Sequence, residues 1–152
     1  MGIRLTPTEA WDVIAASHTG ILTTLRRDGT PVSLPVWFVV DQQTIGMMTP
    51  SGTKKVSRIR HDPRASFLVE SGQRWEELRA VHLTGRVQVV DDPDAVACIG
   101  SAFNAKYAPF RPASAALPTQ TQAYYADQTF LRFTPEGRML TWDNARIPLT
   151  KT

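Results

Sequence analysis

Three short β-prone segments follow one another near the start of the chain, with only tight turns between them. They cover residues 21–25, 31–40 and 44–49, and the intervening turns contain Asp28-Gly29 and Asp41-Gln42-Gln43. Asp-Gly is a strong hairpin signal, and a short turn can join only antiparallel strands, because a parallel pair needs a long crossover connection. The sequence therefore predicts an antiparallel sheet that begins as a meander of three strands.

The rest of the chain mixes further strands with short helices. Strands are expected at residues 64–70, 80–90, 124–134 and 138–142. Thr6 and Glu9 form a capping-box pattern that predicts a helix to about Ser17, a second helix is expected at residues 53–61, and Asp92 can cap a third that runs to Phe103. The proline-rich residues 107–122 are expected to form an irregular loop.

Seven or so short strands in one small chain favour closure into a barrel, because open edges invite pairing with other chains. A length of 152 residues is typical of one domain. We therefore predict a mainly β (α+β) fold over residues 1–152: a single domain with an antiparallel barrel of six to seven strands and peripheral helices.

Composition excludes several classes of protein. No apolar run approaches the roughly 18 residues of a membrane span, and the first twenty residues carry charges where a secretory signal is apolar. We therefore expect no membrane span and a cytoplasmic location. The single Cys98 cannot form an internal disulfide, and His18, His61 and His82 lack metal-ligand spacing, so no metal is expected.

Positive charge is concentrated in one short segment. Residues 51–64 contain five basic side chains and one acidic side chain, whereas the whole chain has a net charge of +3, so this segment carries the entire excess. Such a run is either a solvated helix face or an anion-binding site. Phe67 is the only aromatic residue nearby and no nucleic-acid motif is present, so a nucleic-acid partner is not expected.

The start of the predicted helix at residues 53–61 favours the second interpretation. Lys54 and Lys55 lie in its first turn, where the helix dipole favours an anion by roughly 0.3–1 kcal/mol. The free backbone N–H groups there, together with these ammonium groups and the hydroxyls of Thr49, Ser51 and Thr53, make a candidate phosphate site. The spacing does not match a Walker loop, so nucleoside triphosphate chemistry is not indicated.

Two neighbouring motifs resemble a known phosphate-binding stretch. They are Thr49-Pro50-Ser51-Gly52-Thr53-Lys54-Lys55 and Arg60-His61-Asp62-Pro63-Arg64. The pyridoxamine 5'-phosphate oxidase-like flavoproteins have a Thr followed four residues later by a hydroxyl residue and two basic residues, then a short helix and Asn/Asp-Pro-Arg. The likeness extends along most of the chain and is greatest to the short coenzyme F420-dependent oxidoreductases of actinobacteria. It implies a split β-barrel homodimer with a cofactor in each of two grooves at the subunit interface.

The resemblance also implies roles for individual residues. Lys55 would be the main phosphate ligand, assisted by Lys54 and the nearby hydroxyls. Val36 and Trp37 would lie on the strand whose backbone runs beside the cofactor ring. Trp142 and Arg146 resemble a C-terminal Trp and Arg that would close the pocket from the partner subunit. Trp37 and Trp142 are equally consistent with plain core aromatics.

Three further positions are relevant to the identity of the cofactor and substrate. Arg58 and Arg60 either face water or meet the acidic tail of coenzyme F420. The founding oxidases have a Gln where this chain has Ala80, so one amide contact to the ring is missing and pyridoxamine phosphate is not the expected substrate.

The function implied is that of a coenzyme F420-dependent oxidoreductase. It would transfer a hydride between the deazaflavin and a small conjugated organic substrate, with the chemistry supplied by the cofactor and no dedicated catalytic side chain. Two alternatives keep the fold: an oxidoreductase that uses FMN, and a non-catalytic carrier of a flavin or haem.

Overall fold

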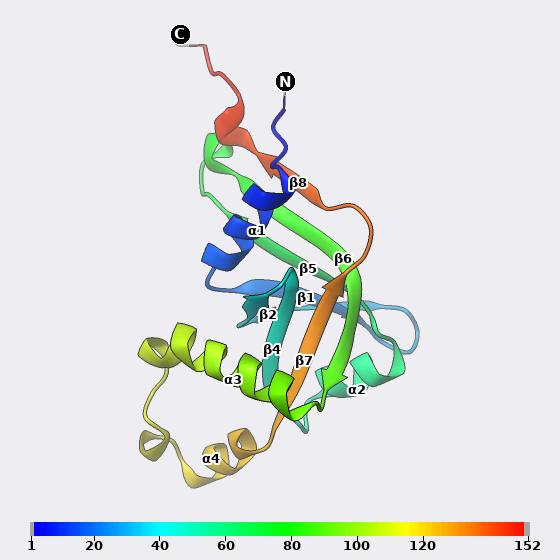
Figure 1. The fold of residues 1–152 in the computed structure, drawn as a ribbon, viewed down its shortest axis with the longest axis vertical. Coiled ribbons are helices and arrows are strands. Elements are labelled where there is room, and N and C mark those ends of the chain that lie inside the picture. The colour runs from blue at the N-terminus through cyan, green and yellow to red at the C-terminus, as the bar shows by residue number, and fades with distance from the viewer. Residues whose placement is uncertain (1, 151–152) are drawn as a thin grey trace.

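The structure, a computed structural model, describes residues 2–150 as eight strands and several helices (Figure 1). The strands are β1 (Gly20–Leu25), β2 (Pro31–Val36), β3 (Val39–Asp41), β4 (Thr44–Pro50), β5 (Arg64–Ser71), β6 (Arg79–Val90), β7 (Gln128–Pro135) and β8 (Leu140–Asp143). The α-helices are α1 (Pro7–Ala16), α2 (Lys54–His61), α3 (Pro93–Tyr107) and α4 (Thr119–Ala126). Short 3₁₀ turns occur at Trp75–Glu77, Ala108–Phe110, Ser114–Ala116 and Asn144–Arg146.

All strand pairs are antiparallel, and the sheet closes on itself. The order is β2-β1-β5-β6-β7-β4-β3, with β8 pairing with the first part of β6. The two strands at the ends of this order, β2 and β3, are consecutive in sequence, with only Trp37 and Phe38 between them. One extended segment therefore belongs to both edges of the sheet, and the sheet must curl into a barrel. The predicted α+β barrel with peripheral helices is confirmed.

The two antiparallel hairpins of the predicted meander are confirmed, but its middle strand is not continuous. The expected single strand at residues 31–40 breaks after Val36, so β2 pairs with β1, β3 pairs with β4, and β2 does not extend the β4 ladder. This break also raises the number of strands to eight. Pro31 and Pro35 lack the N–H that an interior strand must donate, which restricts β2 to an edge.

Helix boundaries follow the capping signals in the sequence. Thr6 and Glu9 form the expected capping box at α1, and Asp92 accepts from the N–H of Ala95 at the start of α3. Helix α3 continues four residues beyond the predicted end at Phe103 because nothing breaks it before Pro109. The loop expected at residues 107–122 was predicted wrongly in part.

That proline-rich region contains two 3₁₀ turns and the beginning of α4, and the tyrosines at 124 and 125 are helical instead of starting a strand. Pro118 is the N-cap of α4, and no proline or glycine follows it within the helix. Pro118 precedes the first helical residue, so its missing N–H costs α4 no hydrogen bond, and the β propensity of two tyrosines does not decide the local structure. The last strand also starts later than predicted, at Leu140.

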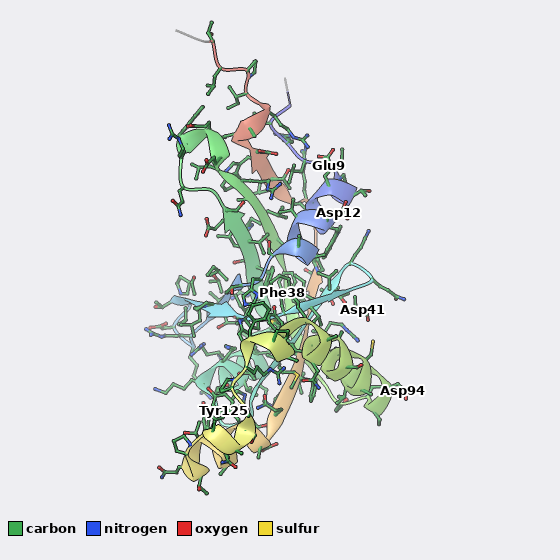
Figure 2. The ribbon with its side chains drawn as sticks, turned by 90° about the vertical axis from the view of Figure 1, so that its left-hand side faces the viewer. Glu9, Asp12, Phe38, Asp41, Asp94 and Tyr125 are labelled. Carbon is green, nitrogen blue, oxygen red and sulfur yellow. The ribbon has the colours of Figure 1, made fainter. Side chains whose placement is uncertain are left out.

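The hydrophobic core fills the barrel and extends under α1 and α3. Phe38, Phe67 and Phe133 are fully buried in its centre, and Figure 2 shows Phe38 close to the middle of the molecule. Trp11 and Ile14 join the same core from α1, as their helical spacing predicts. A second cluster forms where α3 covers β3 and β4. No helix within residues 2–150 has the length and apolarity that crossing a bilayer requires.

Candidate functional site

The turn between β4 and α2 is held in place by β7. Thr49 is buried at the end of β4 and is paired with Thr129 of β7. The Ser51 N–H donates to the Asp127 carbonyl over 3.1 Å, and the Thr129 hydroxyl lies 2.8 Å from that of Ser51. The backbone that leads into α2 is therefore fixed by neighbours distant in sequence, and the helix start has a defined position.

Thr53 is the N-cap of α2, but its hydroxyl does not cap the helix. Its backbone is extended, as the position requires, yet its side chain accepts no hydrogen bond from the first turn. The Oγ1 atom is buried and has no hydrogen-bond partner within residues 2–150. No acidic residue lies in the first turn of the helix. A buried hydroxyl without a partner is unfavourable, so this N-terminus is suited to an anionic oxygen.

Lys55 is a half-buried cation. Burial lowers the pKa of its ammonium, and the positive charge of Arg58 lowers it further. Neither Lys54 nor Lys55 forms an ion pair with a carboxylate in the described part of the chain. Arg58 donates from Nε to the buried Thr24 hydroxyl over 3.0 Å. Within residues 2–150, no carboxylate thus compensates the positive charge of these two lysines.

The one acidic residue of the basic segment is already engaged. Asp62 forms an ion pair with Arg64 over 2.8 Å, and hydrogen bonds from Arg64 lower the pKa of this carboxyl to about 2. Asp62 is therefore ionised at neutral pH, but it points its charge at the strand β5 that follows. It does not neutralise the start of α2.

An open groove of about 530 Å³ runs along one face of α2. Among the residues that line it are Arg27, Ser51, Gly52, Thr53, Arg60 and His61. Lys55 does not line this groove. Arg58, three residues later and so on the same helix face as Lys55, reaches Thr24 of β1. Helix α2 therefore presents cations on two faces, with its N-terminus between them.

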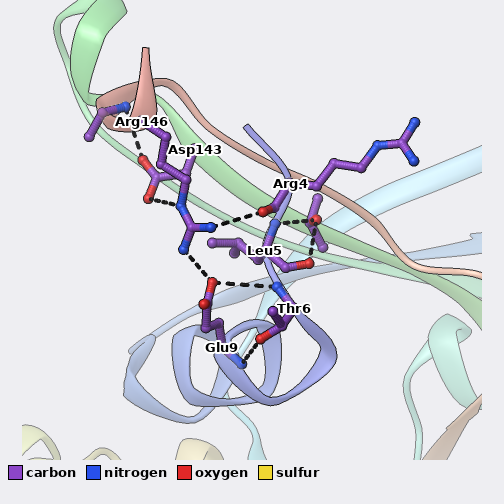
Figure 3. A network of polar contacts seen from close by, with 8 residues as sticks. Arg4, Leu5, Thr6, Glu9, Asp143 and Arg146 are labelled. Carbon is purple, nitrogen blue, oxygen red and sulfur yellow. Dashed lines mark hydrogen bonds and ion pairs between the residues drawn. The ribbon is translucent and has the colours of Figure 1, made fainter. Parts of the chain in front are cut away.

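Trp142 and Arg146 lie far from this groove in the chain. β8 pairs with the first part of β6, whereas α2 packs at the other end of the barrel (Figure 1). The Arg146 guanidinium pairs with the carboxylate of Glu9 and donates to the Arg4 carbonyl over 2.9 Å (Figure 3). Trp142 is 38% exposed. The structure does not bring these two residues to the α2 turn of their own chain.

Val36 is the last residue of β2, and Trp37 is the first residue of the break between β2 and β3. Val36 is buried in the main core, and the Trp37 ring stacks on Tyr107 of α3, with ring centroids 4.4 Å apart and planes 3° from parallel. The side chains of both residues are thus turned to the interior. Any ligand at this position meets their backbone.

Two residues at the end of α3 were not predicted from the sequence to have a role here. Tyr107 is fully buried, and the Lys106 ammonium donates to the carbonyls of Ser17 and Phe38 over 2.8 and 3.0 Å. The signal for Tyr107 was available, since Ile99, Phe103 and Tyr107 repeat every four residues on one helix face. No group of three His, Cys, Asp or Glu side chains suited to a metal forms within residues 2–150.

Comparison with known proteins assigns the fold to a family. A family model described as Pyridoxamine 5'-phosphate oxidase matches residues 6–140. The chain belongs to this family. A search of curated proteins gave no match.

Solved structures share the fold over nearly the whole chain. A conserved hypothetical protein of Mycobacterium tuberculosis, Rv2991, is 27% identical, with a TM-score of 0.79 over 97% of this chain and 92% of that one. A FAD-binding protein from Mycobacterium smegmatis is 22% identical, with a TM-score of 0.64 over 91% and 93%. A protein described as F420 reductase is 21% identical, with a TM-score of 0.64 over 89% and 98%.

Replacing the orphaned Thr53 hydroxyl should stabilise the free protein. Thr53→Val removes a buried polar atom that has no partner, so we expect the free energy of unfolding to rise by about 1 kcal/mol in urea denaturation. The matched control is Thr6→Val at α1, where the hydroxyl accepts from the Glu9 N–H and its loss should cost about 1 kcal/mol. Equal losses in both variants would contradict the structure.

The stability of the protein should increase with pH above neutrality. Burial lowers the pKa of Lys106 to about 8, whereas an unfolded chain has a lysine near 10.5. Between these values the unfolded state binds more protons, so the free energy of unfolding rises with pH; Lys55 acts in the same direction. Urea midpoints at about pH 7.5 and about pH 9.5 measure the rise. Lys106→Met should reduce it, and an unchanged rise would contradict the assignment.

Proposed function

We propose that the N-terminus of α2 binds the phosphate of a flavin-type cofactor. The observation that carries this proposal is the uncompensated pair at the helix start: the partnerless Thr53 hydroxyl and the half-buried, unpaired Lys55 ammonium. A phosphate oxygen supplies the acceptor for the hydroxyl proton and the counter-charge for the lysine. Lys54 and the hydroxyls of Thr49 and Ser51 complete the donors around it. Membership of the family supports this placement.

Coenzyme F420 is the cofactor that we propose, with FMN as the alternative. Coenzyme F420 carries carboxylates beyond its phosphate, whereas FMN carries only the phosphate. Arg27 and Arg60 on the groove have no carboxylate partner within residues 2–150, so the site has more positive charge than one phosphate balances. One protein of the same fold is described as F420 reductase, although others are described as FAD-binding.

The activity that we propose is reduction of a small conjugated organic molecule. The bound ring supplies hydride chemistry, and the chain binds, orients and shields it. The phosphate is held at α2, the ring lies against the backbone of Val36 and Trp37, and the protein acts as a homodimer. Trp142 and Arg146 then approach each ring from the partner subunit. Light scattering should give a mass twice the 16.9 kDa of one chain.

Titration of the purified apo protein with both cofactors tests the proposal. We expect coenzyme F420 to bind at least about tenfold more tightly than FMN at physiological salt, because the extra carboxylates meet the groove cations. Tighter binding of FMN would select the alternative cofactor. Binding of neither compound would refute the proposal.

A non-catalytic carrier is the second candidate. The haem storage protein HutZ of Vibrio cholerae has the same fold, with 12% identity and a TM-score of 0.69. Tight binding of haem or a flavin, without oxidation of the reduced cofactor by any of a panel of quinones and nitroaromatics, would favour this candidate over a reductase.

A further inference from the structure

Side chains of α3 supply the hydrogen bonds of the bend between β2 and β3. Trp37 and Phe38 lie outside both strands, so no sheet ladder satisfies their backbone groups. The Phe38 N–H donates to the Tyr107 hydroxyl oxygen over 2.8 Å. That hydroxyl lies 2.8 Å from the carbonyls of both His18 and Phe38, to one of which it donates. One side chain therefore fixes the bend and the segment that leads into β1.

Lys106, the residue before Tyr107 on α3, makes further contacts with the same bend. Its ammonium donates to the Phe38 carbonyl over 3.0 Å and to the Ser17 carbonyl over 2.8 Å, and it lies 3.9 Å from the centre of the Phe38 ring. Within residues 2–150 no carboxylate pairs with it. Partial burial of a cation without a counter-ion is energetically unfavourable. Its hydrogen bonds to two carbonyls give it a positional role that an apolar side chain does not have.

The bend leaves the last residues of β4 without a β3 partner next to the turn between β4 and α2. In the β3–β4 ladder Val39 is paired with Gly46, and this register, if continued, sets Trp37 level with Met48 and Val36 level with Thr49. The ladder ends at Val39 because the chain turns away to pair with β1. β4 is thus left without a partner on this side over its last residues, which lead into the α2 turn. The angle of the bend sets the separation between the Val36–Trp37 backbone and that turn.

We propose that Lys106 and Tyr107 are positioning residues for the ring half of the cofactor site. They hold the backbone of the bend at the distance from the α2 turn that the ring requires, while Lys55 holds the phosphate. This inference rests on the proposed function, and it adds a second, separable anchor to the site. It assigns to the end of α3 a role in ligand binding that involves no direct contact with the phosphate.

Two ligands that differ only in the phosphate distinguish the phosphate site at Lys55 from the bend held by Lys106 and Tyr107. Riboflavin is FMN without its phosphate, so dissociation constants for both compounds are measured by flavin fluorescence with wild type, Tyr107→Phe and Lys106→Met. Tyr107→Phe keeps the ring that stacks on Trp37 and removes only the hydroxyl. We expect each variant to weaken FMN and riboflavin by the same factor, about tenfold. The emission maximum of bound riboflavin should also shift, which a general loss of stability does not produce.

The matched control is Tyr124→Phe, which removes a hydroxyl from a tyrosine that is 51% exposed on α4, and its constants should equal those of the wild type. Thermal unfolding without ligand establishes that each variant is folded at the assay temperature. If wild type binds the flavins and both α3 variants bind them equally well, the inference is overturned while the proposed function stands. If wild type binds neither flavin nor a deazaflavin, the proposed function itself fails.

Discussion

Lys55→Ala is expected to weaken the binding of both coenzyme F420 and FMN by about 100-fold. A hydrogen bond to a charged group contributes about 1.5–3 kcal/mol, and 2.7 kcal/mol corresponds to a factor of 100 in affinity. The free protein should lose no stability, because burial and Arg58 already disfavour the charged form of Lys55. Fluorescence titration of each cofactor and urea denaturation of the free protein measure the two effects.

Lys54→Ala is the matched control for this prediction. Lys54 is adjacent in sequence and carries the same charge, but its side chain is exposed, so water screens its attraction for a phosphate. We expect only a severalfold loss of affinity, and one that disappears at high salt. Equal effects of the two variants would mean that the helix acts as a diffuse basic face. In that case no built phosphate site exists at Lys55.

Gly85→Ala should strongly destabilise the fold. Gly85 lies in β6 between β5 and β7, opposite Ala65 and Pro135. A β-carbon at this position would lie 2.1 Å from the Thr134 carbonyl oxygen and 2.9 Å from the Pro135 Cα, and both are backbone atoms of a paired strand. Backbone cannot move aside as a flexible side chain does. We expect a loss of about 3 kcal/mol or more, a large part of the 5–15 kcal/mol typical of domains.

Gly100→Ala provides the contrast. Gly100 lies within α3, and the nearest atom to an added β-carbon is on the Phe130 ring at 3.5 Å, an ordinary contact. Alanine in a helix interior is favoured over glycine by about 1 kcal/mol, so this variant should gain stability in urea denaturation. A similar response of the two variants would show that the close approach of β7 to Gly85 is wrong.

Local signals in the sequence were sufficient to predict much of the fold. The capping box at Thr6, the cap at Asp92 and the Asp62-Pro63 stop after α2 each depend on residues within a few positions, and the structure has all three. The Asp28-Gly29 turn joins β1 to β2 for the same reason: Gly29 adopts a positive φ of 85°. Each of these features needs no information from distant parts of the chain.

Features that depend on distant residues were not predictable in this way. Residues 31–40 have a continuous apolar pattern that predicts one strand. The structure breaks this strand at Trp37–Phe38, where Tyr107 and Lys106 from α3 make the hydrogen bonds to Phe38. The engagement of Arg146 with Glu9 joins residues 137 positions apart. The hydroxyls and lysines of the α2 turn were identified from spacing alone. That the Thr53 hydroxyl has no partner within residues 2–150 became visible only with every neighbour in place.

The most direct measurement is a crystal structure of the protein with coenzyme F420 or FMN bound. The account predicts phosphate oxygens about 2.7–2.9 Å from Lys55 Nζ, with a further oxygen in hydrogen-bond contact with Thr53 Oγ1. The ring should lie against the backbone of Val36 and Trp37. A cofactor bound with its phosphate away from the start of α2, or a Lys55 ammonium that pairs with a carboxylate of the partner subunit, would contradict it.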